Sequence, residues 1–147
     1  MADSCDSADA LHKVRLRTDA LRFLLALAGA SPASGADAAT SRIRTIMARM
    51  RRKPEGDYPQ DELVAKTQLS ASTIATLFKR ETGMTPHEFL VTCRIRKATD
   101  ILVSSDVPIT RLALELGFSS SQHFAARFRR ETGQTPRELR RALAQKN

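Results

Sequence analysis

The segment FKRETGMTPHE at residues 78–88 recurs as FRRETGQTPRE at residues 128–138, and eight of the eleven positions are identical. The two segments are offset by fifty residues. Upstream of them the offset falls to forty-nine, so that Leu69 pairs with Phe118. The chain therefore contains an internal repeat, and its second copy has one extra residue within the SSSQ stretch.

Each copy of the repeat predicts two short helices separated by a tight turn. These helices are expected at about 60–67 and 71–82 in the first copy and at about 108–116 and 120–131 in the second. Gly83 and Gly133 follow the second helices, where a left-handed helix end favours glycine. Helix, turn, helix is the signature of the helix-turn-helix motif. Five apolar residues should hold the second helices on the core: Ile74, Leu77, Phe78, Phe124 and Phe128.

The two copies are joined by TPHEFLVTCRIRKATDILV at residues 85–103, which predicts one long helix. Thr85 suits its N-cap and Pro86 its first turn. Apolar residues three to five apart predict one stripe that serves both cores: Phe89, Leu90, Cys93, Ala98, Ile101 and Leu102. At ~1.5 Å per residue the helix is about 28 Å long, close to the ~34 Å of one DNA turn. Two roles stay open for Arg94 and Arg96: bracing the two copies, or contacting phosphates between them.

The chain has 147 residues and a net charge of +8. Residues 1–40 hold four Lys/Arg and five Asp/Glu, whereas residues 41–147 hold twenty and eleven. The basic excess thus lies with the repeat, as in domains that bind polyanions. With only Cys5 and Cys93, and no apolar run near the ~20 residues of a membrane span, we expect a cytoplasmic, nucleoid-associated protein without a disulfide framework or membrane partner. Cys93 is expected to be a core residue.

The N-terminal part predicts three segments before the repeat. Residues 1–29 should be a disordered tail followed by an accessory helix at about 9–28, and residues 30–40 a linker rich in Ala, Ser and Gly. The domain should then span residues 41–147. Its first helix, about 41–52, should bury Ile43, Ile46, Met47 and Met50. The helix at 9–28 must bury an apolar stripe by docking on the domain, by self-association, or as the remnant of a sensor domain.

In a helix-turn-helix motif, side chains near the start of the second helix meet base edges in the major groove. The residues expected to contact bases are Ser72, Thr73, Thr76, Ser121, Gln122 and His123. The amide of Gln122 matches the N6 and N7 pattern of adenine. For His123 the alternative is a histidine partly buried against the long helix. The residues expected to contact phosphates are Lys79, Arg80, Arg127, Arg129 and Arg130, because a basic pair recurs in both copies; the alternative is solvated surface charge.

Three stretches resemble the AraC/XylS family of bacterial transcription regulators: LSASTIATLFKRETGMTPHEFL, RIRKATDIL and VPITRLALELGFSSSQHFAARFRRETGQTPRELR. The resemblance covers about residues 41–142. It implies an all-α, seven-helix domain with two helix-turn-helix units joined by a long central helix, here with an added N-terminal helix. It also implies that the second helices enter successive major grooves of double-stranded DNA, and that the bound domain contacts or positions RNA polymerase. The family's N-terminal sensing barrel is absent, so we expect either a short member or a fragment without its sensor.

The chain departs from the family pattern at several positions. Gln68 stands where the family usually has a turn glycine, and Thr67 where it has a larger apolar residue, which predicts a less rigid first unit. Thr76 and Ala126 stand where arginine is frequent. The base-reading set is therefore short, and specificity should depend more on Gln122, Ser121 and DNA shape.

Other functional classes find little support in the sequence. The three histidines lie far apart, and no CxxC, HExxH or glycine-rich phosphate loop is present, so neither an enzyme nor a cofactor or metal site is expected. The alternative from another class is a protein-interaction module that modulates RNA polymerase or another regulator without a DNA site of its own. The outward faces of both second helices combine small residues with basic ones, and this composition favours DNA binding over that alternative.

Overall fold

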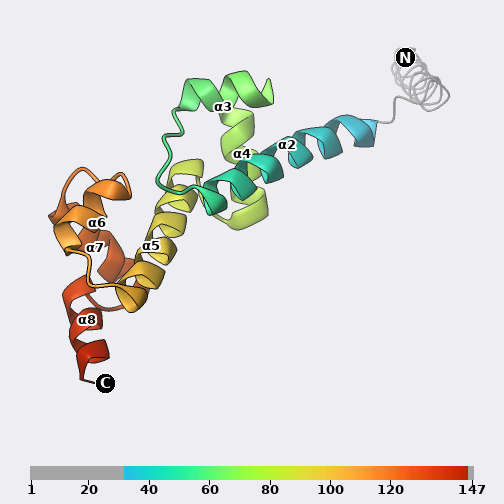
Figure 1. The fold of residues 1–147 in the computed structure, drawn as a ribbon. Helices are drawn as coiled ribbons and strands as arrows, with labels where there is room; N and C mark the ends of the chain where they lie inside the picture. Colours follow the sequence, from blue (N-terminus) through green and yellow to red (C-terminus); the bar gives the residue numbers. More distant parts are fainter. Residues whose placement is uncertain (1–31, 146–147) are drawn as a thin grey trace, which may run out of the picture. The chain divides into compact units, whose positions relative to one another are not determined.

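The computed structural model describes residues 32–145, and this part of the chain is helical, without strands (Figure 1). Its helices are α2 (Pro32–Arg52), α3 (Gln60–Thr67), α4 (Ala71–Thr82), α5 (Pro86–Ser104), α6 (Ile109–Glu115), α7 (Ser121–Thr132) and α8 (Pro136–Ala144). The chain divides between Thr40 and Ser41, and the part from Ser41 onward holds both copies of the repeat. The predicted all-α fold with two helix-turn-helix units is confirmed. The predicted tail and accessory helix lie outside the described residues.

Helix α2 begins at Pro32, well before the predicted start at residue 41. The linker prediction is therefore wrong for residues 32–40. Proline suits the first turn of a helix, and alanine, which occurs four times in residues 32–40, is the best helix former. The Thr40 hydroxyl also donates to the Ala36 carbonyl at 2.8 Å, as in a continuous helix. The four residues predicted for its core face are all buried: Ile43, Ile46, Met47 and Met50.

Local caps set the ends of the repeated helices. The Ser70 and Ser120 side chains accept hydrogen bonds from the first turns of α4 and α7. Gly83 and Gly133 end these helices with φ of 74° and 82°. Thr85 forms a capping box at the start of α5, and α8 starts with the same device. Because these signals are local, the predicted bounds of the helices are confirmed to within a residue or two.

The central helix α5 has two apolar faces, so the predicted single stripe is wrong. Phe89, Leu90 and Cys93 are buried near its start, and the Phe78 and Phe89 rings meet edge to face at 5.8 Å. A second row packs into the core of the second copy: Val91, Ile95, Ala98 and Leu102. A helix that lies between two cores must bury both sides, and the two rows lie on different sides of the helix axis. The structural roles predicted for Phe89, Cys93 and Leu102 are confirmed by their burial.

The core of the second copy is centred on three aromatic rings. Phe124 and Phe128 are fully buried, and Phe118 is 4% exposed. Ring centroids lie 5.1 Å apart for Phe118 and Phe124 and 5.6 Å apart for Phe124 and Phe128. Helices α7 and α8 both pack against α5 around this cluster. The buried face of α7 is thereby fixed, and its opposite face is left to solvent.

The turns of the two helix-turn-helix units differ at one equivalent position. Gln68 ends α3 with φ 55° and ψ 32°, the left-handed region, and Gly117 holds the matching place after α6 with φ 77°. A residue with a Cβ pays roughly 1–2 kcal/mol in this region. The Arg42 guanidinium donates to the Thr67 carbonyl at 3.0 Å beside the turn. The first turn thus adopts the same conformation as the second in spite of an unfavourable residue.

Gln68→Gly should therefore stabilise the domain. The strain of about 1–2 kcal/mol is removed, and glycine costs about 0.5–1 kcal/mol in the unfolded chain, so the net gain should be about 0.5–1 kcal/mol. Urea unfolding followed by circular dichroism measures this difference. The matched control is Lys66→Gly within α3, which should lower stability by about 1 kcal/mol. Equal losses for both variants would refute the assignment of strain to Gln68.

Candidate nucleic-acid interface

Helix α4 presents one polar face to solvent. Its 3.6-residue period places Ser72, Thr76, Lys79 and Arg80 opposite the buried row, and all four are exposed. Thr73 is also exposed, but its hydroxyl lies 2.8 Å from the Ser70 hydroxyl within the N-cap. The residues predicted for DNA contact in the first copy therefore gather on one face, with Thr73 at its edge.

Helix α7 repeats this arrangement fifty residues later. Gln122, Ala126, Arg129 and Arg130 are exposed and occupy the positions that correspond to the outward residues of α4. Ser121 is half-buried at the start of the helix. The basic pair in the last turn thus has the same orientation in both copies. The short Thr76 and Ala126 side chains lie at the centre of each face.

Two predicted contact residues of the second copy lie at the edge of this face. The His123 ring is exposed; it meets the Phe118 ring edge to face at 5.7 Å, and its Nδ1 lies 3.3 Å from the Ser119 hydroxyl. The alternative of a histidine buried against α5 is therefore wrong. Arg127 is half-buried, at the position held in the first copy by the buried Leu77.

The arginines of α7 act electrostatically on the carboxylates of both capping boxes. Hydrogen bonds from Thr85 lower the pKa of Glu88, and the charges of Arg130 and Arg127 lower it further. The pKa of Glu138 is lowered by hydrogen bonds from its own capping threonine and then by Arg129 among others. The arginines of α7 therefore add positive potential at the starts of α5 and α8.

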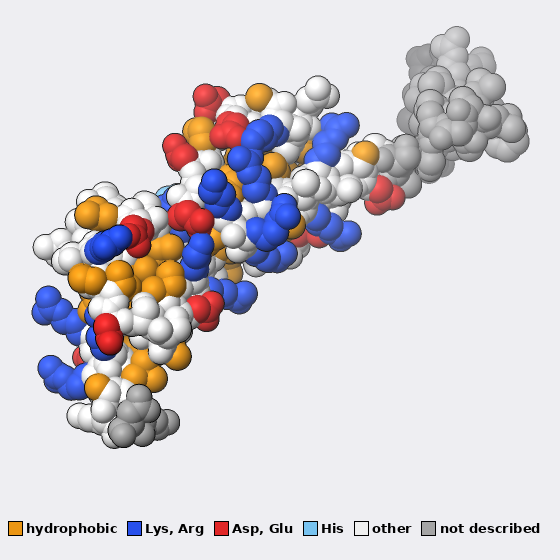
Figure 2. Space-filling model, in the orientation of Figure 1, with side chains coloured by type: hydrophobic (Ala, Val, Ile, Leu, Met, Phe, Trp, Pro, Cys, Tyr) orange, Lys and Arg blue, Asp and Glu red, His pale blue; other side chains and the backbone are white. Residues whose placement is uncertain are grey.

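Basic side chains extend beyond the two outward faces. Figure 2 shows Lys and Arg gathered over α2, whose last turn contains Arg49, Arg51 and Arg52. Some of this charge is paired, as in the ion pair of Arg49 with Glu62 at 3.3 Å and the ion pair of Arg44 with Glu81 at 3.0 Å. The domain therefore has a positive surface of the kind that attracts a polyanion.

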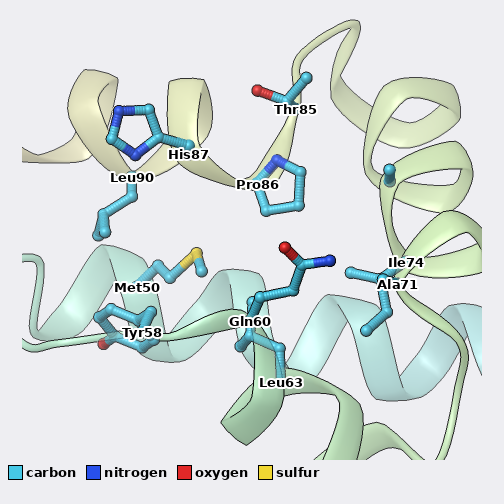
Figure 3. A pocket seen from close by; sticks show the side chains of 11 residues that line it. Met50, Tyr58, Gln60, Leu63, Ala71, Ile74, Thr85, Pro86, His87 and Leu90 are labelled. Atoms are coloured by element: carbon cyan, nitrogen blue, oxygen red, sulfur yellow. The ribbon is translucent and has the colours of Figure 1, made fainter.

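A hollow lies beside the inner edge of each outward face. The first has a volume of about 220 Å³, and Figure 3 shows Met50, Leu63, Ile74 and Leu90 among its apolar walls and Gln60, Tyr58 and His87 among its polar ones. The second has a volume of about 320 Å³. Six of its lining residues are equivalent to residues that line the first: Ile109, Ser121, Ala125, Thr135, Pro136 and Arg137; Thr110 and Gln122 complete it. Because the hollow recurs, it follows from how each helix-turn-helix unit packs on the next helix.

Residues 63–142, more than half of the chain, match the family described as "Helix-turn-helix domain". The fold is similar to a transcriptional regulator of Chromobacterium violaceum with an AraC-type DNA-binding domain, at a TM-score of 0.63 and 25% identity over 78% of this chain and 99% of that one. The chain belongs to the AraC/XylS family. The predicted resemblance is thereby confirmed.

The chain is also similar to other members of the AraC/XylS family. The DNA-binding domain of the global transcriptional factor AdpA, solved in complex with a target DNA, has a TM-score of 0.67 and 25% identity over 72% of this chain and 96% of that one. The activator RhaS of Escherichia coli (strain SE11) is 31% identical over 71% of this chain. The regulator MtrA of Neisseria gonorrhoeae is 32% identical over 49%. This chain spans 38% of the RhaS length and 24% of the MtrA length.

Residues 32–145 offer neither a membrane-spanning helix nor a metal site. No helix in this range has the length and apolarity needed to cross a bilayer. No group of three or more His, Cys, Asp or Glu side chains within it is arranged to hold a metal ion.

The sequence does not indicate which groups Arg94 and Arg140 contact. Arg94 donates to three main-chain carbonyls, and Arg140 of α8 donates to the Val107 carbonyl at 2.7 Å. Backbone acceptors carry no residue signature, so no pattern in the sequence marks these contacts.

Proposed function

We propose that this AraC/XylS-family domain regulates transcription by inserting α4 and α7 into two successive major grooves on one face of double-stranded DNA. The observation that carries the proposal is the repetition of one outward face on two helices held by α5. Each face has small or polar residues at its centre and a basic pair in its last turn. This composition suits a helix that approaches base edges closely and is flanked by phosphates.

Each predicted contact residue has a role in the proposal. Bases are read by Ser72, Thr73, Thr76, Ser121, Gln122 and His123, and phosphates are bound by Lys79, Arg80, Arg127, Arg129 and Arg130. Gln122 makes the main sequence-specific contact, because its amide is the longest hydrogen-bonding side chain among the proposed base-reading residues of the first turn of either helix. Arg127, being half-buried, contacts phosphate from the edge of the outward face of α7. The similarity to the DNA-bound domain of AdpA supports this mode of binding.

The wider partners of the protein follow from the same proposal. A domain bound on one DNA face can contact or position RNA polymerase, which is the expected partner in regulation. A sensor domain or a second copy of the chain would attach through residues 9–28, outside the described part. The rival, a protein-interaction module without its own DNA site, predicts no preference among DNA sequences.

Selection of duplex sites from a random pool, followed by titration against salt, tests the proposal. Binding should enrich one long asymmetric site, and log Kd plotted against log salt should have a steep slope of about 0.9 per phosphate contacted. A flat salt dependence or an unenriched pool would contradict DNA binding by these faces and favour the interaction module.

Gln122→Ala should mainly reduce preference among sites. Loss of one bidentate base contact should cost about 1–3 kcal/mol at the selected site, and binding to unrelated duplexes should change little. Fluorescence anisotropy with the selected site and a scrambled duplex measures both. Ser72→Ala, at the equivalent position of α4, is the matched control and should have a smaller effect because its side chain is shorter. An equal loss on both duplexes for Gln122→Ala would exclude its reading role.

A further inference from the structure

Arg94 lies in the middle of α5, and its guanidinium donates three hydrogen bonds, all to main-chain carbonyl oxygens. Nε donates to Pro54 at 2.9 Å, Nη2 to Gly56 at 3.1 Å and Nη1 to Gly117 at 2.8 Å. Pro54 and Gly56 lie in the loop between α2 and α3, which leads into the first helix-turn-helix unit. Gly117 forms the turn of the second. One side chain therefore joins both units.

The surroundings of Arg94 restrict its position. Its Cζ lies 6.0 Å from the centre of the Phe118 ring. A Cβ at Gly117 would lie 2.8 Å from Nη2, so the turn approaches the guanidinium as closely as glycine allows. Lys97, one turn further along α5, forms an ion pair with Glu55 at 2.8 Å. We call Arg94 and Lys97, with the loop residues 54–56 and Gly117, the α5 brace.

The chemistry of the α5 brace requires arginine at position 94. Guanidinium has five N–H donors in a rigid plane and can serve three separated acceptors, whereas the lysine ammonium places its donors on one nitrogen. Burial also lowers the pKa of Arg94, although Asp57 and Tyr58 nearby raise it. The charge is therefore partly removed from water and held by carbonyl dipoles, and these bonds are stronger there than at an exposed site.

The α5 brace acts on the first unit through the loop. The loop continues directly into α3 at Gln60, and α3 packs against α4. The Tyr58 hydroxyl donates to the Arg49 and Lys53 carbonyls, which fixes the far end of the loop on α2. On the other side, the Gly117 turn sets where α7 begins relative to α5. Movement of one unit against the other would break at least one bond of Arg94.

We propose that Arg94 is a positioning residue that fixes the separation and rotation of α4 relative to α7, and so selects the spacing between the two half-sites on DNA. This inference rests on the proposed function. Of the two roles that the sequence left open for Arg94, its three hydrogen bonds favour bracing over phosphate contact.

Arg94→Lys, tested on DNA of altered spacing, separates positioning from simple stability. The selected site is rebuilt with one or two base pairs added or removed between its half-sites; each base pair changes the separation by about 3.4 Å and the rotation by about 35°. The unmodified chain should lose about tenfold or more in affinity for a one-pair change. Arg94→Lys should bind all spacings within about threefold of one another, with its affinity for an isolated half-site unchanged.

The control is Arg96→Lys, the same change at an exposed position two residues along α5, which should keep the original spacing preference. A uniform loss at every spacing for Arg94→Lys, with the optimum retained, would overturn the proposal. If the unmodified chain shows no spacing preference, two-groove binding itself fails. If thermal melts show that Arg94→Lys does not fold, Glu55→Gln is the second test, because it removes only the ion pair to Lys97. Glu55→Gln should still broaden the spacing profile. An unchanged profile would overturn the proposal.

Discussion

Phe128→Ala should lower the free energy of unfolding by about 3–5 kcal/mol, because a fully buried aromatic side chain is lost and a cavity remains. The Phe128 ring packs 5.6 Å from that of Phe124, in the cluster where α5 and α7 meet. The cluster fixes the orientation of α7, so DNA binding should fall as well. Urea unfolding monitored by circular dichroism gives the free energy.

Arg129→Ala is the matched control for Phe128→Ala, since it changes the next residue, which is exposed. It should alter stability by no more than about 0.5 kcal/mol. A small effect of Phe128→Ala, comparable to that of Arg129→Ala, would show that the aromatic cluster is not the core of the second copy.

The double variant Arg129→Ala, Arg130→Ala should bind every duplex about a hundredfold more weakly at low salt, because each lost charge-assisted bond is worth about tenfold or more. The log–log salt slope should fall by about 1.8, as two phosphate contacts disappear. Selected and scrambled duplexes should be affected alike. Anisotropy titrations at several salt concentrations measure both quantities.

Two further sets of variants serve as comparisons for the Arg129→Ala, Arg130→Ala double variant. Lys79→Ala with Arg80→Ala removes the equivalent pair on α4 and should reduce the slope similarly. Arg111→Ala removes a basic residue whose charge is paired with Glu115 at 2.7 Å, and should change the slope little. A changed base preference in the Arg129 and Arg130 variant would mean that these arginines read sequence, contrary to the proposed roles.

The helices of the repeat were predictable because their signals lie within a few residues of one another. Ser70 caps the start of α4 and Gly83 its end, and Thr85 with Pro86 starts α5. Each of these contacts spans no more than one helical turn of the sequence. The start of α2 was not predictable from composition, since Gly35 and the serines there suggest a linker while the alanines favour helix.

The two-sided burial of α5 depends on where the second core lies, which a single helical pattern does not reveal. Val91 and Ile95 are buried toward that core although they lie off the predicted stripe. Arg127 is a second case. The repeat aligns it with the buried Leu77, but an arginine in a basic run suggests full exposure, and the structure shows it half-buried.

For the candidate interface, periodicity was enough to place Gln122, Arg129 and Arg130 on one exposed face. The contacts of Arg94 span 23 to 40 residues of sequence and end on backbone atoms, so no spacing of residue types indicates them. Which outward side chain meets which base depends on the DNA sequence and its shape, and these assignments stay predictions.

The acceptors of Arg94 are carbonyl oxygens, which every amino acid possesses. Substitution at Pro54 or Gly56 therefore need not be compensated at Arg94, and Gly117 is constrained by its own backbone angle and by space. Correlated substitution, the usual trace of contact between distant positions, should be absent here. Among relatives that share this contact, we expect an arginine kept at this position with no covarying partner, so that methods which infer contacts from covariation would miss the link between the two reading helices.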